Sequence, residues 1–239
     1  MLTKRINVTT MVTGQDNETE IVTTHEEVIH MKIAVVGASG KAGSHIVKEA
    51  LDRGHEVTAI VRDASKVSGN AAVIEKDVFD LTASDLQAFD VVVNAFGAAP
   101  GQEHLHVDAG NALIAALKGS NTRLIVVGGA GSLYVDEAKT LKVMDTPDFP
   151  AIYFPTASNQ GKNLDILKET ADLKWTFISP SALFALGQRT GSYVKGKDHL
   201  LVNSKGESYV SYEDYAIAVV DEIEQPQHIG ERFTVVSES

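Results

Sequence analysis

Short apolar segments alternate with amphipathic segments from Met31 to the end of this chain, and this alternation constrains the fold more than any other feature. Continuous short apolar runs are typical of strands buried on both faces, which occur in parallel sheets covered by helices. The pattern predicts strands at Lys32–Val36, His55–Val61, Ala71–Glu75, Val91–Asn94, Leu124–Val127, Trp175–Ile178 and Phe233–Val236. It predicts helices over residues 41–53, 105–117 and about 160–172, and a last helix from near Ser211. The predicted fold is α/β, with a doubly wound parallel sheet.

We expect one domain over residues 31–239, which is within the usual size of open α/β sheets. Residues 181–210 interrupt the alternation of strands and helices, because they contain scattered glycines and short β-like segments. We predict that they form a small cap over a ligand site. Residues 1–30 differ in character and are expected to be an extension without catalytic role, either a hairpin or disordered. In the last helix, Ser211 and Asp214 resemble a capping box, and the acidic residues are predicted to form a solvated face.

The composition excludes several classes of function. A net charge of −11 argues against nucleic acid as a partner, because such proteins need a basic surface. The absence of cysteine removes disulfides, thiol nucleophiles and thiolate metal sites. No apolar run is long enough for a membrane span, and the acidic N-terminus does not resemble a secretory signal. We therefore expect a cytoplasmic protein, a monomer or homodimer, that acts on a small molecule.

A glycine-rich turn follows the first strand directly and opens the first helix: Gly37-Ala38-Ser39-Gly40-Lys41-Ala42-Gly43. In dinucleotide-binding folds, one glycine permits the sharp turn, one lets the backbone approach the pyrophosphate, and one lets helix and strand pack closely. The helix N-terminus then offers free N–H groups and positive partial charge to the phosphates. This context predicts a Rossmann-type fold that binds a nicotinamide dinucleotide through Gly37, Ser39, Gly40, Lys41, Ala42 and Gly43.

The end of the second strand indicates which dinucleotide is bound. An acidic residue at this place holds the ribose hydroxyls of NAD. Here the strand ends in Arg62, whose guanidinium matches a phosphate dianion in geometry and charge, with Lys66 one helical turn further on. Arg62 favours the 2′-phosphate of NADP. The alternative is that Arg62 is a solvated surface residue and that Asp63 contacts NAD.

The ends of the third and fourth strands supply the other predicted contacts. Asp77-Val78 follows the third strand, where such folds contact the adenine, although Asp77 could instead cap the next turn. The stretch Asn94-Ala95-Phe96-Gly97 ends the fourth strand, beside the path of the ribose and the nicotinamide. Small residues there let a dinucleotide lie against the strand ends.

The opening Lys32–Gly43 resembles that of the atypical short-chain dehydrogenase/reductases. More narrowly, the chain is similar to bacterial NADH-flavin reductases, a group related to NmrA-like proteins and to the biliverdin reductase B type of flavin reductase. The resemblance spans residues 31–236 and is carried by Val127-Gly-Gly-Ala-Gly-Ser-Leu133, Trp175-Thr-Phe-Ile-Ser-Pro-Ser181, and the tail from Gly187-Gln-Arg-Thr-Gly191 to Phe233-Thr234. It implies NAD(P)H chemistry, with Arg62 and Lys66 as a 2′-phosphate clamp.

The proton-transfer set of the main short-chain dehydrogenases is incomplete. They use a serine, a tyrosine and a lysine four residues after it, which lowers the pKa of the tyrosine. Ser132 and Tyr153 are the best-placed candidates, but Ala157 stands where the lysine is required. Flavin reduction needs mainly orientation, because the remaining proton can come from water. On this interpretation Ser132, Tyr153 and Ser181 orient the ligands. The residues Phe154, Leu183 and Phe184 either form an apolar platform for a flat ring or belong to the core.

The sequence therefore predicts an NAD(P)H-dependent reductase that transfers hydride to a flavin (FMN, FAD or riboflavin) or a quinone-like flat acceptor. The alternative is a non-catalytic, NmrA-like sensor of redox state; a nucleotide-sugar epimerase or dehydratase ranks third. His104 and His106 lack a third metal ligand at a suitable spacing and are expected at a helix start, so no metal is predicted. The polar segment at residues 158–162 either borders the cleft or leads into the next helix.

Overall fold

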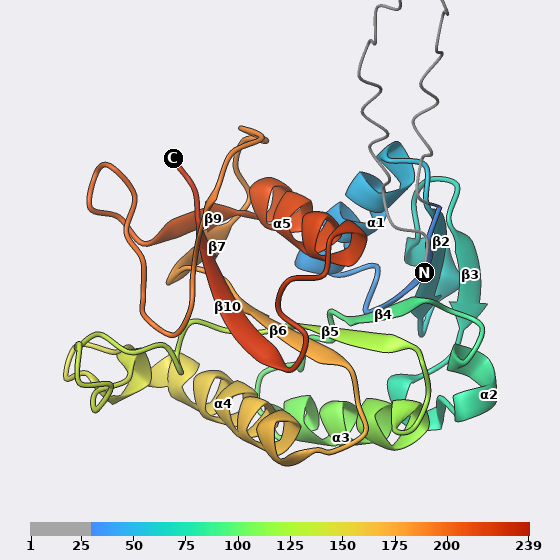
Figure 1. Cartoon of the computed structure of the whole chain (residues 1–239), viewed down its shortest axis with the longest axis horizontal. Helices are drawn as coiled ribbons and strands as arrows, with labels where there is room; N and C mark the ends of the chain where they lie inside the picture. Colours follow the sequence, from blue (N-terminus) through green and yellow to red (C-terminus); the bar gives the residue numbers. More distant parts are fainter. Residues whose placement is uncertain (1–29) are drawn as a thin grey trace, which may run out of the picture.

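The computed structural model describes residues 30–239, so the extension predicted over residues 1–30 lies, apart from His30, outside the described part of the chain. Within that part, a single sheet of eight strands forms the middle layer of the fold (Figure 1). Its order is β3-β2-β1-β4-β5-β6-β10-β8, and every neighbouring pair is parallel except β10 with β8. The strands are β1 (Lys32–Val36), β2 (Glu56–Val61), β3 (Ala72–Glu75), β4 (Val91–Asn94), β5 (Arg123–Val127), β6 (Trp175–Ser179), β8 (Val194–Gly196) and β10 (Glu231–Val236).

Helices cover both faces of the sheet (Figure 1). Helices α1 and α5 pack together on one face, and α3 and α4 pack together on the other. The short helix α2 follows β3. Their bounds are α1 (Lys41–Asp52), α2 (Ala83–Leu86), α3 (Leu105–Leu117), α4 (Phe154–Glu169) and α5 (Tyr212–Glu224). The predicted doubly wound α/β fold is therefore confirmed.

Alternation along each central strand divides the core into two clusters. In β1, Ile33 and Val35 belong to the cluster beneath α1 and α5, whereas Ala34 and Val36 belong to the cluster above α3 and α4. All four side chains are buried. Because both faces of the strand are covered, its sequence is apolar throughout rather than alternating with polar residues. Strands β2 and β3 lie on one side of β1, and the chain then crosses from β3 to β4 on the other side. The strand order therefore reverses between β1 and β4, and ligands bind at such a switch point.

The predicted cap region contains three strands. Strands β7 (Leu183–Ala185) and β9 (Tyr209–Ser211) pair in a separate two-stranded sheet, while β8 extends the edge of the main sheet. The region is thus partly an extension of the sheet rather than a cap alone.

Helix α4 begins at Phe154, earlier than the predicted start at about residue 160. Pro155 stands in its first turn, where the missing N–H of proline removes no intrahelical bond. The sequence did not indicate this first half of the helix, because the polar residues 158–162 interrupt the pattern of apolar residues that marks a helix face. Tyr153 is the residue before the helix, and the polar segment belongs to the helix itself.

The prediction of a solvated acidic face on α5 was wrong for Asp214 and Glu222, which are buried. The Ser211 hydroxyl caps the helix by accepting from the Asp214 N–H at 2.9 Å. The Asp214 carboxylate, however, accepts from Thr190 (N–H 2.9 Å, hydroxyl 2.7 Å) and from the Gly191 N–H at 3.0 Å, rather than completing a capping box. The carboxylate thus fixes a distant loop on the helix.

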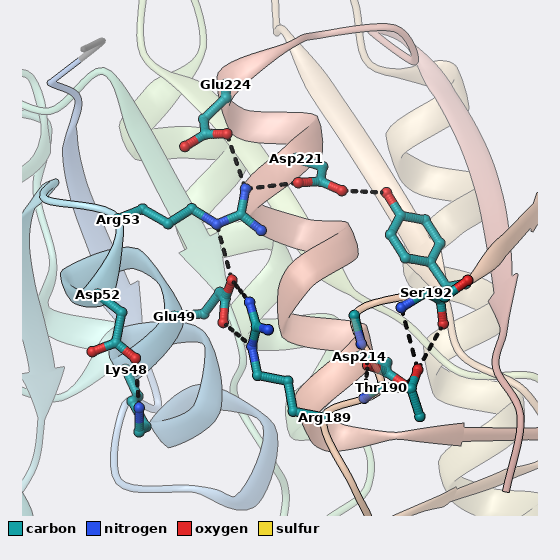
Figure 2. Close-up of polar contacts among 12 residues, drawn as sticks. Lys48, Glu49, Asp52, Arg53, Arg189, Thr190, Ser192, Asp214, Asp221 and Glu224 are labelled. Carbon is teal, nitrogen blue, oxygen red and sulfur yellow. Dashed lines mark hydrogen bonds and ion pairs between the residues drawn. The ribbon is translucent and has the colours of Figure 1, made fainter.

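A charged network joins this same loop to α1 and α5 (Figure 2). Glu49 of α1 accepts two hydrogen bonds from Arg189, at 2.8 and 3.0 Å, and one from Arg53 at 2.9 Å. Arg53 also donates to Asp221 at 2.7 Å and to Glu224 at 2.9 Å on α5. Burial of Glu49 opposes its ionisation, but hydrogen bonds from the two guanidinium groups outweigh burial and lower its pKa. The network holds the two helices and the loop in one arrangement.

Candidate dinucleotide site

A cavity of about 570 Å³ lies along the ends of β1, β2, β3, β4 and β5, on both sides of the switch point. Its wall is formed by Val36, Gly37, Ser39, Gly40, Lys41, Ala42, Ile60, Val61, Arg62, Lys76, Asp77, Val78, Ala95, Phe96, Gly97, Ala98, His106, Val127, Gly128, Gln160, Phe184 and Tyr212. The volume is in the range of small-molecule and cofactor sites. An elongated ligand can therefore lie across the strand ends.

The glycine turn is built as its spacing requires. Gly37 has a φ of 74°, and a Cβ there would lie 2.5 Å from the Ala95 carbonyl oxygen. A Cβ at Gly43 would lie 2.3 Å from the Gly37 carbonyl oxygen, so the first turn of α1 packs directly on the turn. A Cβ at Gly40 would lie 3.1 Å from the same oxygen. Gly37 therefore shapes the turn, and Gly43 permits the close packing of helix and turn.

The N-terminus of α1 supplies the anion-binding part of the wall. The first intrahelical bond runs from the Ser44 N–H to the Gly40 carbonyl at 2.9 Å, which leaves the N–H groups of Lys41, Ala42 and Gly43 without an intrahelical partner. The Gly40 N–H donates to the Gly37 carbonyl at 2.9 Å. Ser39, Gly40, Lys41 and Ala42 all line the cavity here. Free N–H groups and the helix dipole favour an anion at this position.

The end of β2 places Arg62 in the wall and removes Asp63 from it. Arg62 is exposed and forms no ion pair or hydrogen bond with any residue in the described range 30–239. The Asp63 carboxylate caps the short helix η1 (Ala64–Lys66) by accepting from Ser65, at 3.0 Å from the N–H and 2.6 Å from the hydroxyl. Lys66 lies 3.5 Å from Asp63 and outside the cavity wall. Of the two candidates for the ribose end, Arg62 lines the cavity and Asp63 does not.

The end of β3 brings Asp77 and Val78 to the cavity as predicted, together with Lys76. The Asp77 carboxylate accepts from the Phe79 N–H at 3.2 Å and caps the short helix η2 (Val78–Asp80), which was the alternative role considered for it. Lys76 donates to Asp85 at 2.7 Å. Asp77 thus lines the cavity and caps the turn at once.

The end of β4 forms the middle of the wall. Ala95, Phe96 and Gly97 line the cavity, but Asn94 is buried, and its side-chain oxygen accepts from the Phe96 N–H at 3.1 Å. Asn94 therefore shapes the turn beneath the cavity. His106, near the start of α3, also lines it and packs edge-on against Phe96, with ring centroids 5.9 Å apart. Burial lowers the pKa of His106, so the neutral imidazole is favoured.

Beyond β4 the wall is formed by residues that the site prediction did not include. Val127 and Gly128 end β5, Gln160 comes from α4, and Tyr212 opens α5. Phe184, which the sequence offered as either platform or core, lies in this wall with its ring centroid 4.4 Å from that of Tyr212. The expectation that residues 158–162 border the cleft holds for Gln160, whereas no feature of the sequence indicated Tyr212.

Ser132 and Tyr153, the candidate catalytic residues, and Ser181, a candidate for cofactor binding, do not line the cavity. Ser132 is buried, and its hydroxyl accepts from Arg232 at 3.0 Å. Tyr153 has 62% of its surface exposed and is not part of the wall. The Ser181 hydroxyl is buried and donates to the Val235 carbonyl at 2.8 Å, which ties β6 to β10.

Ala157 stands at the position of the missing lysine and is buried. A Cβ at Gly131 would lie 2.5 Å from the Ala157 Cβ, so the loop after β5 packs closely on this residue. Within residues 30–239, no group of three or more His, Asp or Glu side chains is arranged to hold a metal ion.

These features define a class. The parallel sheet, the glycine turn at the helix N-terminus and the cavity at the switch point are those of a Rossmann-type dinucleotide-binding protein. The sequence matches the NAD(P)H-binding family over residues 37–226, and the chain belongs to that family.

Three similar proteins span this chain almost completely. The uncharacterized protein YwnB of Bacillus subtilis is 67% identical over 212 residues, which are 87% of this chain and all of YwnB. A crystal structure from Streptococcus pneumoniae, of a protein with a proposed NADH-flavin reductase activity, is 47% identical with a TM-score of 0.84 and covers 87% of this chain and 100% of its own. A proposed epimerase from Bacteroides thetaiotaomicron is 35% identical with a TM-score of 0.79, and covers 88% of this chain and 99% of its own. In residues 30–239, no helix is long and apolar enough to cross a membrane.

Proposed function

We propose that this protein is an NADPH-dependent reductase that transfers hydride to a flavin or another flat, quinone-like acceptor. The proposal rests on which residues line the cavity and which do not. The wall provides for a dinucleotide, but neither Tyr153 nor Ser132 belongs to it, and the lysine position holds the buried Ala157. Such a wall suits a reaction in which the protein positions two rings and performs little proton transfer.

The direction of the dinucleotide follows from the strand order. The pyrophosphate belongs at the N-terminus of α1, next to β1, and the adenosine belongs on the side of β2. The nicotinamide then lies on the opposite side, past Phe96 and toward Val127 and Gly128. The far end of the cavity is therefore where hydride would leave the dinucleotide.

The preference for NADPH rests on Arg62. Its exposed guanidinium faces the cavity without a partner among the described residues, whereas Asp63 is engaged with Ser65 and Lys66. Guanidinium groups bind phosphate in a bidentate manner, and a carboxylate at the same place would bind ribose hydroxyls instead. Lys41 adds positive charge to the wall of a protein whose net charge is −11, whereas Lys76 is paired with Asp85.

The acceptor is proposed from the nicotinamide end of the wall. Bound NADPH would supply a hydride from C4 of the nicotinamide to N5 of a flavin ring, and water would provide the one proton that completes the reduction. The Phe184 and Tyr212 rings offer apolar surface on the α5 side of this end. The similarity to the Streptococcus pneumoniae protein supports the same class of acceptor.

A second candidate function is a redox sensor that binds NADP(H) without catalysis. The absence of the acid–base set from the described wall favours it, since binding alone needs none of these groups. An epimerase, suggested by the Bacteroides relative, is disfavoured because Ala157 replaces the lysine that such proton transfers require.

Steady-state oxidation of NADPH in the presence of FMN, FAD, riboflavin or a quinone tests the proposal. Turnover with at least one acceptor supports it. Binding of NADP(H) without oxidation by any of them, and with different affinities for the oxidised and reduced forms, would establish the sensor instead.

A further inference from the structure

Gln160 is the one residue of α4 in the described wall of the cavity, and it lies at the end assigned to the nicotinamide. Along the same helix, Ala157 is buried against Gly131, and Leu164 points into the core beneath the sheet. Gln160 is half-buried between these positions. Its amide forms no hydrogen bond with any residue from 30 to 239, although it has two donors and an acceptor.

The loop after β5 leaves room for this side chain. A Cβ at Gly129 would lie 2.0 Å from the Gln160 Oε1 and 3.1 Å from its Cδ. Gly129 does not have a positive φ, so the conformation of the backbone does not require glycine. The Gln160 carboxamide therefore lies directly over the backbone of this loop, next to Gly128 of the wall, in space that a side chain at position 129 would share.

A neutral amide at this place fits hydroxyl groups. The nicotinamide ribose presents two hydroxyls, each of which can donate and accept, and an amide offers both kinds of partner. The cationic groups Lys41 and Arg62 lie in the part of the wall formed by the start of α1 and the end of β2, which suits the phosphates. Gln160 lies across the switch point from them, beside the end of β5.

We propose that Gln160 is a positioning residue that binds the ribose of the nicotinamide half of the cofactor and so sets the orientation of the hydride-donating ring. This inference rests on the proposed binding of NADP(H), but not on the identity of the acceptor. A residue with this role contributes to binding of the whole dinucleotide and contributes nothing to binding of its adenosine half.

The test compares the binding of the whole dinucleotide with the binding of its adenosine half. Dissociation constants for NADPH and for 2′,5′-ADP, measured by calorimetry, are compared in the wild type, in Gln160→Leu and in Asn159→Leu. Asn159 is the matched control, because it precedes Gln160 on α4, donates to the Pro155 carbonyl at 2.8 Å and lies outside the wall. Thermal denaturation confirms that both variants fold, and the pair NADH and ADP is measured in parallel.

Loss of one or two net hydrogen bonds predicts that Gln160→Leu weakens NADPH binding about fivefold to tenfold. Binding of 2′,5′-ADP is expected to stay within about twofold, and Asn159→Leu to change neither. Equal loss for both ligands would assign Gln160 a structural role, and no loss for either would remove it from the site; each result overturns the inference. Because these are binding measurements, the inference can survive if no flavin is reduced, and it can fail while flavin reduction is confirmed.

Discussion

Replacement of Arg62 by alanine is expected to weaken NADPH binding while leaving NADH binding nearly unchanged. The guanidinium is exposed at the cavity wall, and it has no competing partner in the described part of the chain. A hydrogen bond to a charged group contributes about 1.5–3 kcal/mol. Solvent screens an exposed group, so we take the lower part of this range, which corresponds to a loss of about 10- to 30-fold in affinity.

The assay is titration of intrinsic or nicotinamide fluorescence with NADPH and with NADH, for the wild type and for Arg62→Ala. The reasoning requires a loss of about tenfold or more for NADPH and less than about threefold for NADH. Asp63→Ala is the matched control, because its carboxylate caps η1 and lies outside the wall. Equal losses for both nucleotides in Arg62→Ala would remove Arg62 from the phosphate site, and a selective loss of NADH binding in Asp63→Ala would establish the NAD alternative.

Three further changes have expected outcomes. Gly43→Ala places a Cβ 2.3 Å from a backbone carbonyl, so urea denaturation should show a loss of about 1–3 kcal/mol, and an unchanged midpoint would refute the packing argument. Tyr153→Phe should leave kcat/KM within about twofold, because the exposed ring is outside the wall; a loss of about a hundredfold would identify a proton donor. Burial of Asp198 opposes its ionisation, but hydrogen bonds from Lys139 and Arg232 outweigh burial and hold its pKa at about 2, below the ordinary 3.8. The lowered pKa stabilises the fold above about pH 4, and this contribution is lost as the pH falls toward 2. The stability difference between wild type and Asp198→Asn should therefore shrink between pH 7 and pH 3, and a constant difference would contradict the ion-pair account.

The sequence was sufficient to predict what local patterns determine. Strand β4 and helix α3 have the predicted bounds. Gly43 packs on Gly37 within the first βαβ unit, so its role follows from the spacing, whereas the close contact of Gly37 is with Ala95 after β4. The presence of Arg62 and Asp77 in the cavity wall was predictable from the strand ends. Arg62 and Asp77 stand directly at strand ends, and parallel strands end at one edge of the sheet.

Features that depend on distant partners were not predictable in this way. Glu222 is buried because Arg123 pairs with it and His228 lies 2.7 Å away, and no local pattern relates these residues. Gln160 and Tyr212 reach the cavity only because α4 starts at Phe154 and α5 follows β9 at the same edge. The end of the cavity that we propose for the nicotinamide is therefore formed by segments that are far apart in the sequence.

The central claim is that the bound nicotinamide gives its hydride to a flat acceptor. The most direct measurement is anaerobic mixing of the protein and NADPH with excess FMN, FAD, riboflavin or menadione, followed at the absorbance of both reactants. The account predicts that NADPH disappears and that at least one acceptor is reduced in equal amount. Tight binding of NADPH with no reduction of any of the four would contradict it and would leave the redox sensor as the function of this cavity.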